Sequence, residues 1–287
     1  MAQTMKVPKF WINELEWLDY NNVTALPSEH FRTLPVNPTA FESADITTTY
    51  DLENPFCFIL GHSGLESIAI EDANDTSVIT TTGTLINEDA ALAGWSLMEL
   101  SSATPTAITA EGQIGSIIIG SSWSPPHSPD LSVNLSYDYS GVKSITTKGG
   151  SELTNSFYHG NPKWGATLGA WELGQSGTTQ NLSRSGRKIF DISFSFLSES
   201  DIFPATLNLS TEASTSLDDT LNTGTDDFYG QVIHKLAGSA MPFVFSPDKD
   251  STALDNFSIC KFDQKSFSFQ QTSPSLYSCK MKIREVW

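Results

Sequence analysis

The stretch Arg184–Pro204, RSGRKIFDISFSFLSESDIFP, contains the organising strand, around which we arrange the rest of the chain. Apolar and polar residues alternate in its middle, which places Ile192, Phe194 and Phe196 on one face of a strand and the residues between them on the other. A period of two is typical of a strand that buries one face. We therefore predict a half-buried strand over 189–197, which needs neighbouring strands and a core beside it.

The residues after this strand predict one short helix and a set of closing strands. Apolar residues of 226–236 share one helical face, and Gly238 can end such a helix. Thr225 or Asp226 can cap its first turn. Strands are then predicted over 241–245, 257–262, 267–269 and 276–286.

The residues before the organising strand predict short strands separated by turns. Apolar runs at 55–61 and 114–120 predict strands buried on both faces, and the regular spacing of short strands predicts a β-sandwich. Prolines at 125, 126 and 129 mark a boundary. We predict an N-terminal arm (1–22), a β-sandwich (23–128) and a second β domain (129–287) that holds the helix 226–236. The predicted fold class is all-β.

Aromatic residues near the N-terminus have two possible uses. Trp11 and Trp17 are large apolar side chains, which a chain keeps near a terminus either to close its own core or to reach a neighbouring subunit. The sequence leaves both uses open.

Composition excludes several classes of function. The 287 residues carry a net charge of −17, from 16 lysines and arginines against 33 acidic residues, which argues against a nucleic-acid-binding face. No apolar run of about 18 residues predicts a membrane span, and Met1–Leu18 has no apolar core of a secretory signal. The three cysteines, Cys57, Cys260 and Cys279, form no Cys-x-x-Cys pair, so we expect buried free thiols made in a reducing compartment.

Three patterns resemble catalytic or metal sites without meeting their requirements. Gly-His-Ser-Gly at 61–64 suggests a nucleophile elbow, but that motif needs Gly-x-Ser-x-Gly and residue 65 is leucine. The acidic turn 71–75 lacks the fixed ligand spacing of an EF-hand, and Glu199 and Asp201 permit a glycosidase pair without implying one. We therefore expect no enzyme activity and no catalytic, cofactor-binding or metal-ligating residues.

Five segments in the last hundred residues resemble, as an ordered set, tail proteins of long-tailed bacteriophages. The resemblance is to the minor tail and distal tail group, the tail-tip or baseplate adaptors. Two further segments, 58–70 and 114–120, resemble the galactose-binding-like jelly-roll domains found on phage structural proteins. The five segments are Arg187-Lys-Ile-Phe-Asp-Ile-Ser-Phe-Ser-Phe-Leu, Phe228-Tyr-Gly-Gln-Val-Ile with Gly238, Met241-Pro-Phe-Val-Phe-Ser-Pro, Phe257-Ser-Ile-Cys-Lys-Phe, and Tyr277 to Met281-Lys-Ile-Arg-Glu-Val-Trp287.

These resemblances imply a jelly-roll-like β-sandwich followed by a β-barrel-like domain that assembles into a tail ring. They imply a structural virion component, assembled in the host cytoplasm and located at the tail tip or the tail–baseplate junction. Its expected partners are further copies of itself in a ring, hexameric by analogy, and other tail proteins such as tube, hub or fibre proteins. Neither nucleic acid, membrane nor cofactor is expected.

Six residues are candidates for the contact between ring subunits. A ring subunit presents two different surfaces to its neighbours. The basic cluster at the start of the organising strand and the acidic loop 218–227 are candidates for opposite sides, although such charges are equally expected on solvated strand ends. The candidates are Arg184, Arg187, Lys188, Trp11, Trp17 and Trp287.

The alternative function is a carbohydrate-binding module that contacts host surface glycans. Trp164 and Trp171 lie in a glycine-rich stretch and could stack on a sugar ring, although core or interface packing is the commoner use of such aromatics.

Overall fold

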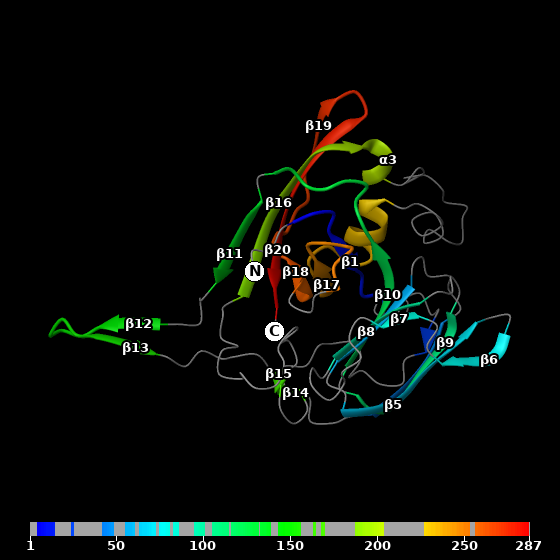
Figure 1. Cartoon of the computed structure of the whole chain (residues 1–287). Coiled ribbons are helices and arrows are strands. Elements are labelled where there is room, and N and C mark those ends of the chain that lie inside the picture. Colours follow the sequence, from blue (N-terminus) through cyan, green and yellow to red (C-terminus); the bar gives the residue numbers. More distant parts are fainter. Residues whose placement is uncertain are drawn as a thin grey trace.

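The computed structural model describes the protein as an all-β chain, as the sequence predicts (Figure 1). Its strands pair antiparallel throughout the described residues. The residues described are 5–14, 24–25, 42–48, 55–60, 63–72, 75–80, 83–85, 95–100, 105–114, 116–131, 133–138, 143–155, 163–164, 168–169, 187–203, 227–252 and 256–286.

The largest sheet has eleven strands and contains the organising strand near one end. Its order is β11-β16-β20-β18-β17-β1-β10-β4-β8-β7, with β19 paired to β20. In chain order these strands are β1 (Lys9–Trp11), β4 (Pro55–Leu60), β7 (Gly83–Leu85), β8 (Trp95–Leu100), β10 (Ser116–Trp123), β11 (Asn134–Asp138), β16 (Arg187–Ser198), β17 (Phe243–Ser246), β18 (Ser258–Phe262), β19 (Phe269–Ser273) and β20 (Leu276–Glu285).

A second sheet and two hairpins contain the remaining strands. The second sheet has the order β2-β3-β9-β5-β6, so the strands of 23–128 are divided between two sheets, which agrees with the predicted sandwich character. Its strands are β2 (Thr24–Ala25), β3 (Glu42–Thr48), β5 (Ser63–Asp72), β6 (Asp75–Thr80) and β9 (Pro105–Ile114). The hairpins pair β12 (Lys143–Thr146) with β13 (Glu152–Asn155) and β14 (Lys163–Trp164) with β15 (Leu168–Gly169).

Strand β1 joins the two halves of the chain. It pairs with β17 on one side, where Phe10 lies opposite Phe245, and with β10 on the other, where Phe10 lies opposite Trp123. The large sheet therefore runs continuously from strands of 129–287, through the N-terminal segment, to strands of 23–128. The division of the chain into an arm and two domains stays a prediction.

Two short helices are present among the described residues, where the sequence predicts one. The predicted helix is found as the π-helical turn η3 (Tyr229–His234), and Gly238, with a φ of +70°, follows it as expected. The carboxylate of Asp227, two residues before η3, accepts a hydrogen bond from the backbone N–H of Gly230 at 2.6 Å. The predicted caps Thr225 and Asp226 lie outside the described residues.

The unpredicted helix is α3 (Glu199–Ile202), in which the Asp201 carboxylate accepts the backbone N–H of Ser198.

One residue of the organising strand lies on the opposite side from the one predicted. Ile192 and Phe194 are buried as expected, but Phe196 is 68% exposed and Leu197 takes the buried place. The cause is a β-bulge, because Phe194 pairs with Cys279 and Leu197 with Tyr277, so β16 has one more residue than β20 over this interval. An extra residue reverses the alternation of faces, and the prediction that Phe196 is buried is therefore wrong.

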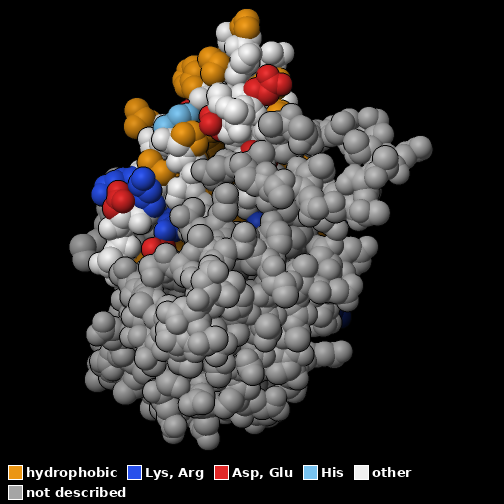
Figure 2. All heavy atoms as spheres, turned by 90° about the vertical axis from the view of Figure 1, so that its right-hand side faces the viewer, with side chains coloured by type: hydrophobic (Ala, Val, Ile, Leu, Met, Phe, Trp, Pro, Cys, Tyr) orange, Lys and Arg blue, Asp and Glu red, His pale blue; other side chains and the backbone are white. Residues whose placement is uncertain are grey.

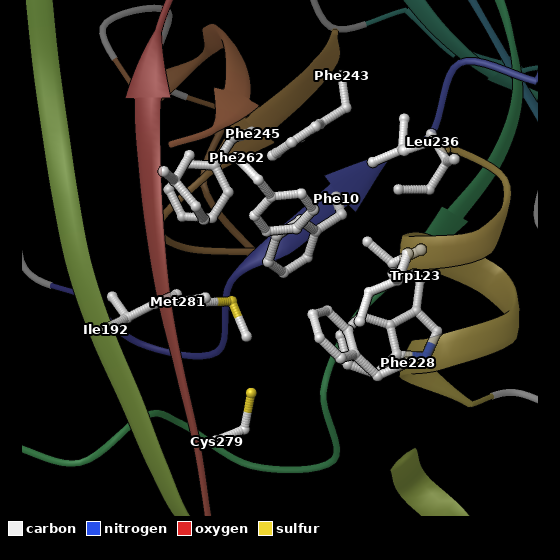
Figure 3. Packing of buried hydrophobic residues seen from close by; sticks show 14 of the residues in the cluster. Phe10, Trp123, Ile192, Phe228, Leu236, Phe243, Phe245, Phe262, Cys279 and Met281 are labelled. Atoms are coloured by element: carbon white, nitrogen blue, oxygen red, sulfur yellow. The ribbon is translucent and has the colours of Figure 1, made fainter. Parts of the chain in front are cut away.

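The main core is a cluster of aromatic rings around Phe10 (Figure 3). Centroid distances from Phe10 are 5.3 Å to Phe245, 5.7 Å to Phe243 and 5.8 Å to Trp123. Helix η3 covers this cluster with Val232 and, from the residue before it, Phe228.

Cys57, Cys260 and Cys279 are buried free thiols in β4, β18 and β20, as predicted. Burial raises the pKa of Cys57 and of Cys279 to about 12.

The chain after β1 stays close against β10. The backbone N–H groups of Ile12 and Glu14 donate to the carbonyls of Ser121 and Ile119, at 2.9 and 3.0 Å. Gly120 lies between these two acceptors, and a Cβ at Gly120 would sit 2.0 Å from the carbonyl oxygen of Ile12. Only a residue without a side chain allows this approach.

We expect Gly120→Ala to destabilise the protein by roughly 1–3 kcal/mol or more, because the methyl group forces the N-terminal segment away from β10. The control is Gly149→Ala, where the nearest atom to a new Cβ is the Thr147 hydroxyl at 4.0 Å. Urea unfolding of both variants measures the difference. Equal stability of Gly120→Ala and the wild type would contradict the close approach described here.

Candidate functional site

The basic cluster at the start of β16 faces a buried carboxylate of the same chain. Glu285 at the end of β20 is buried, and its Oε2 accepts the backbone N–H of Lys188 at 2.9 Å. Burial raises the pKa of Glu285, while the positive charges of Lys188 and Arg187 and the Lys188 hydrogen bond act in the opposite direction. Two of the three predicted basic residues therefore offset the cost of burying this group. The third, Arg184, lies outside the described residues.

This arrangement predicts a pH effect on stability. The pKa of this carboxyl is higher in the folded chain than in the unfolded chain, where it is near 4.5. Such a group makes its full contribution to stability below the unfolded pKa. The contribution is lost as the pH rises through the folded pKa. Glu285→Gln removes this loss and still presents a carbonyl oxygen to Lys188. We expect the stability of the variant relative to the wild type to increase from below pH 4.5 toward neutrality. Urea unfolding across a pH series measures it, and a difference that does not change with pH would contradict the assignment.

The edge strand β11 is attached to the same corner. The Arg284 guanidinium donates to the Asp138 carboxylate at 3.0 Å, which links the end of β20 to the end of β11 across β16. Arg187 and Lys188, which were predicted to contact a neighbouring subunit, therefore also have a structural role within the chain. Their role in a subunit interface stays a prediction.

Trp11 closes the core of its own chain. It is 2% exposed, its ring lies 5.4 Å from that of Phe257, and its indole N–H donates to Glu99 at 3.1 Å. Lys9 forms an ion pair with the same carboxylate. Of the two uses that the sequence left open, the structure shows the internal one for Trp11. The interface candidates Trp17 and Trp287 lie outside the described residues.

Several other sequence patterns fall wholly or partly outside the described residues. These are His62, Trp171, residues 73–74 in the middle of the acidic turn and the acidic stretch 206–225, while Trp164 is described only by its backbone in β14. In the described ranges no group of three His, Cys, Asp or Glu side chains could hold a metal ion. No helix of those ranges is long and apolar enough to cross a membrane.

The predicted proline-rich linker lies against β16. Asp130 donates its backbone N–H to the Ser193 carbonyl at 2.8 Å, and its Oδ2 accepts the hydroxyls of Ser193 and Ser195 at 3.0 and 2.6 Å. The His127 ring lies 2.8 Å from the carbonyl oxygen of Phe196 through its Nε2. These contacts hold residues 127–130 along the bulged part of the organising strand.

Exposed apolar side chains mark surfaces that the sequence analysis did not identify. Figure 2 shows hydrophobic side chains gathered along one described part of the surface, near a group of lysines and arginines. Among the residues whose burial is described, the large exposed hydrophobic ones lie between 131 and 196: Leu131, Tyr137, Ile145, Leu153 and Phe196. The sequence signal for Ile145 and Leu153 was available, since both belong to short alternating segments that flank a Gly-Gly turn.

Comparison with protein-family models, curated proteins and solved structures found no match to this chain.

Proposed function

We propose that this chain is a structural subunit of a bacteriophage tail, which forms a ring at the tail tip or the tail–baseplate junction. The proposal combines the ordered resemblance of five C-terminal segments to tail proteins with the way those segments pack. Its activity is assembly, and its partners are further copies of itself and other tail proteins.

The observation that carries the proposal is the shared core of the five segments. They correspond to β16, η3, β17, β18 and β20, and buried residues from all five belong to one hydrophobic cluster. Four of them are neighbouring strands in the order β16-β20-β18-β17. Because these segments share one core, the resemblance falls on one packed unit of the fold.

The surface of the described residues also suits an assembling protein. Monomeric proteins seldom expose extended apolar patches, and such patches mark contact sites. The large exposed hydrophobic residues that the structure describes lie on the β12–β13 hairpin, on β11, on β16 and on the segment before β11. A ring needs two different surfaces on each subunit, because its contact is heterologous.

Labelled electron microscopy tests the proposal. Gold-labelled antibodies against this chain are expected to mark the distal end of the tail on particles of the virus that encodes it. Label restricted to the head, or absent from purified particles, would overturn the proposal. Glycan-array binding by the purified chain that is lost in Trp164→Ala or Trp171→Ala would favour the carbohydrate-binding alternative instead.

A further inference from the structure

Glu14 and Lys235 form an ion pair that is shut off from water. The Lys235 Nζ lies 3.0 Å from Glu14 Oε1, and the Lys235 and Glu14 side chains are 2% and 0% exposed. The other lysine–carboxylate pairs of the described residues keep more contact with solvent, since Lys6 is 62% exposed, Glu99 33% and Lys282 43%. Burial of two charges carries a desolvation cost. An amide formed from the same two groups has no charge, so its formation removes that cost.

The two oxygens of the Glu14 carboxylate have different surroundings. Oε1 accepts the backbone N–H of Ser121 at 2.9 Å and also the Ser121 hydroxyl, in addition to its contact with Lys235. Oε2 is buried without a hydrogen-bond partner among the described residues. Donors fixed on one oxygen in a site without water stabilise the negative charge that gathers there when a nucleophile adds to the carbon. This arrangement suits a reaction in which Oε1 is kept and Oε2 leaves.

The Lys235 amine is held beside the carboxyl group and has a route for its protons. Its Nζ donates to Gln231 Oε1 at 2.8 Å and lies 3.3 Å from the Ser121 hydroxyl. Because this hydroxyl contacts both Nζ and Glu14 Oε1, it can pass a proton from the amine to the carboxyl group. Lysines that are desolvated by an apolar environment act as nucleophiles in enzymes.

We propose that Lys235 and Glu14 condense to form an intramolecular isopeptide bond. The ion pair seen in the structure is the state before this reaction. A proton passes from the ammonium group to the carboxylate, Nζ adds to the Glu14 Cδ, and the bond from Cδ to Oε2 breaks. Oε2 leaves as water with the two protons that the nitrogen has lost, so an ammonium and a carboxylate become one amide and one water. Holding the two groups in contact makes the reaction intramolecular, and no further reactant is needed.

The bond joins the N-terminal segment covalently to the residue that follows η3. Residues 14 and 235 are far apart in the chain, and a cross-link that closes a long loop lowers the entropy of the unfolded state. Strand β1 then stays tethered beside β10 and β17 when its hydrogen bonds open. The bond forms within a single chain, so it does not depend on the proposed tail role.

Mass spectrometry of the purified full chain tests the bond. The folded wild type is expected to be lighter than its sequence by one water molecule. A protease digest of the same sample is expected to contain one branched peptide that includes both Glu14 and Lys235. A folded wild type that keeps its full mass overturns the proposal, and so does a loss of water that the digest locates at other residues.

Three variants separate the reacting groups from the fold. Lys235→Arg keeps a cation beside Glu14 but supplies no amine, so it is expected to keep its full mass. Ser121→Ala keeps the backbone donor and is expected to react roughly 100-fold more slowly, because the proton relay is lost. The matched control Lys9→Arg changes the more solvated pair with Glu99 and is expected to lose water as the wild type does.

Pulse-labelled chains followed over time give the rates, and near-UV circular dichroism shows whether each variant is folded. Loss of the same water from Lys235→Arg rules out the bond. Equal rates for Ser121→Ala and the wild type rule out the hydroxyl as the relay. The wild-type mass decides the main question even if a variant does not fold.

Discussion

Replacing Phe10 by alanine is expected to lower the free energy of unfolding by about 3–5 kcal/mol, the usual cost of removing a fully buried phenylalanine. Phe10 is completely buried, and its ring is bordered by aromatic side chains from β10, β17 and β18 and from the start of the helical turn (Figure 3). Rings that come from separate strands cannot all move into the vacated space, so most of the cavity remains. Urea unfolding followed by tryptophan fluorescence measures the change.

The matched control is Phe196→Ala, because Phe196 is the exposed phenylalanine of the same sheet. We expect a change within about 0.5 kcal/mol for this variant. Both variants are compared at protein concentrations where the chain is monomeric, since assembly adds to apparent stability. Similar losses in the two variants would show that β1 is not central to the core.

Breaking the buried ion pair between Glu14 and Lys235 is expected to cost about 3–5 kcal/mol, because the remaining charge stays buried without its partner. The Lys235 Nζ lies 3.0 Å from Glu14 Oε1, and both side chains are almost fully excluded from water. The same Oε1 accepts the backbone N–H of Ser121 at 2.9 Å, and Lys235 also donates to Gln231 at 2.8 Å. This pair ties the N-terminal segment to β10 and to the residue that follows η3.

A double-mutant cycle separates the charge from the packing. Lys235→Met is expected to show the full loss, and Glu14→Gln a similar one. The double variant Glu14→Gln with Lys235→Met is expected to lose much less than the sum, because neither charge then remains unpaired. Losses that simply add would rule out coupling between these two side chains.

The two predictions together assign a structural role to residues 9–14. Phe10 and Trp11 fill cores, and Glu14 binds a lysine from the C-terminal part of the chain. Strand β1 also supplies the backbone hydrogen bonds that connect β17 to β10. Removal of the N-terminal segment is therefore expected to separate the two halves of the large sheet.

Much of the C-terminal part could be predicted from residue patterns. The alternation of β20 is observed as predicted, with Cys279, Met281 and Ile283 buried and the residues between them more exposed. The helix before Gly238 is also observed near its predicted place. These features depend on local periodicity, which a sequence displays directly.

The candidate interface could be predicted only in part. The basic residues at 187–188 are conspicuous in an acidic chain, but their proximity to Glu285 depends on the register between β16 and β20. The exposed Ile145 and Leu153 resemble the residues of any half-buried strand, because alternation does not reveal whether a hairpin has a sheet to cover. Whether these two side chains are exposed depends on the tertiary structure.

Composition and local periodicity were enough to predict an all-β protein with a helical turn near 230, buried thiols and an acidic net charge. Three features became visible in the folded chain alone: the N-terminal segment joins the two halves of the large sheet, a bulge exposes Phe196, and Glu14 pairs with Lys235. The physical reason is that strand pairing and register bring together residues far apart in the chain. One extra residue in a strand, or one strand inserted between two others, changes which side chains meet without changing the local pattern.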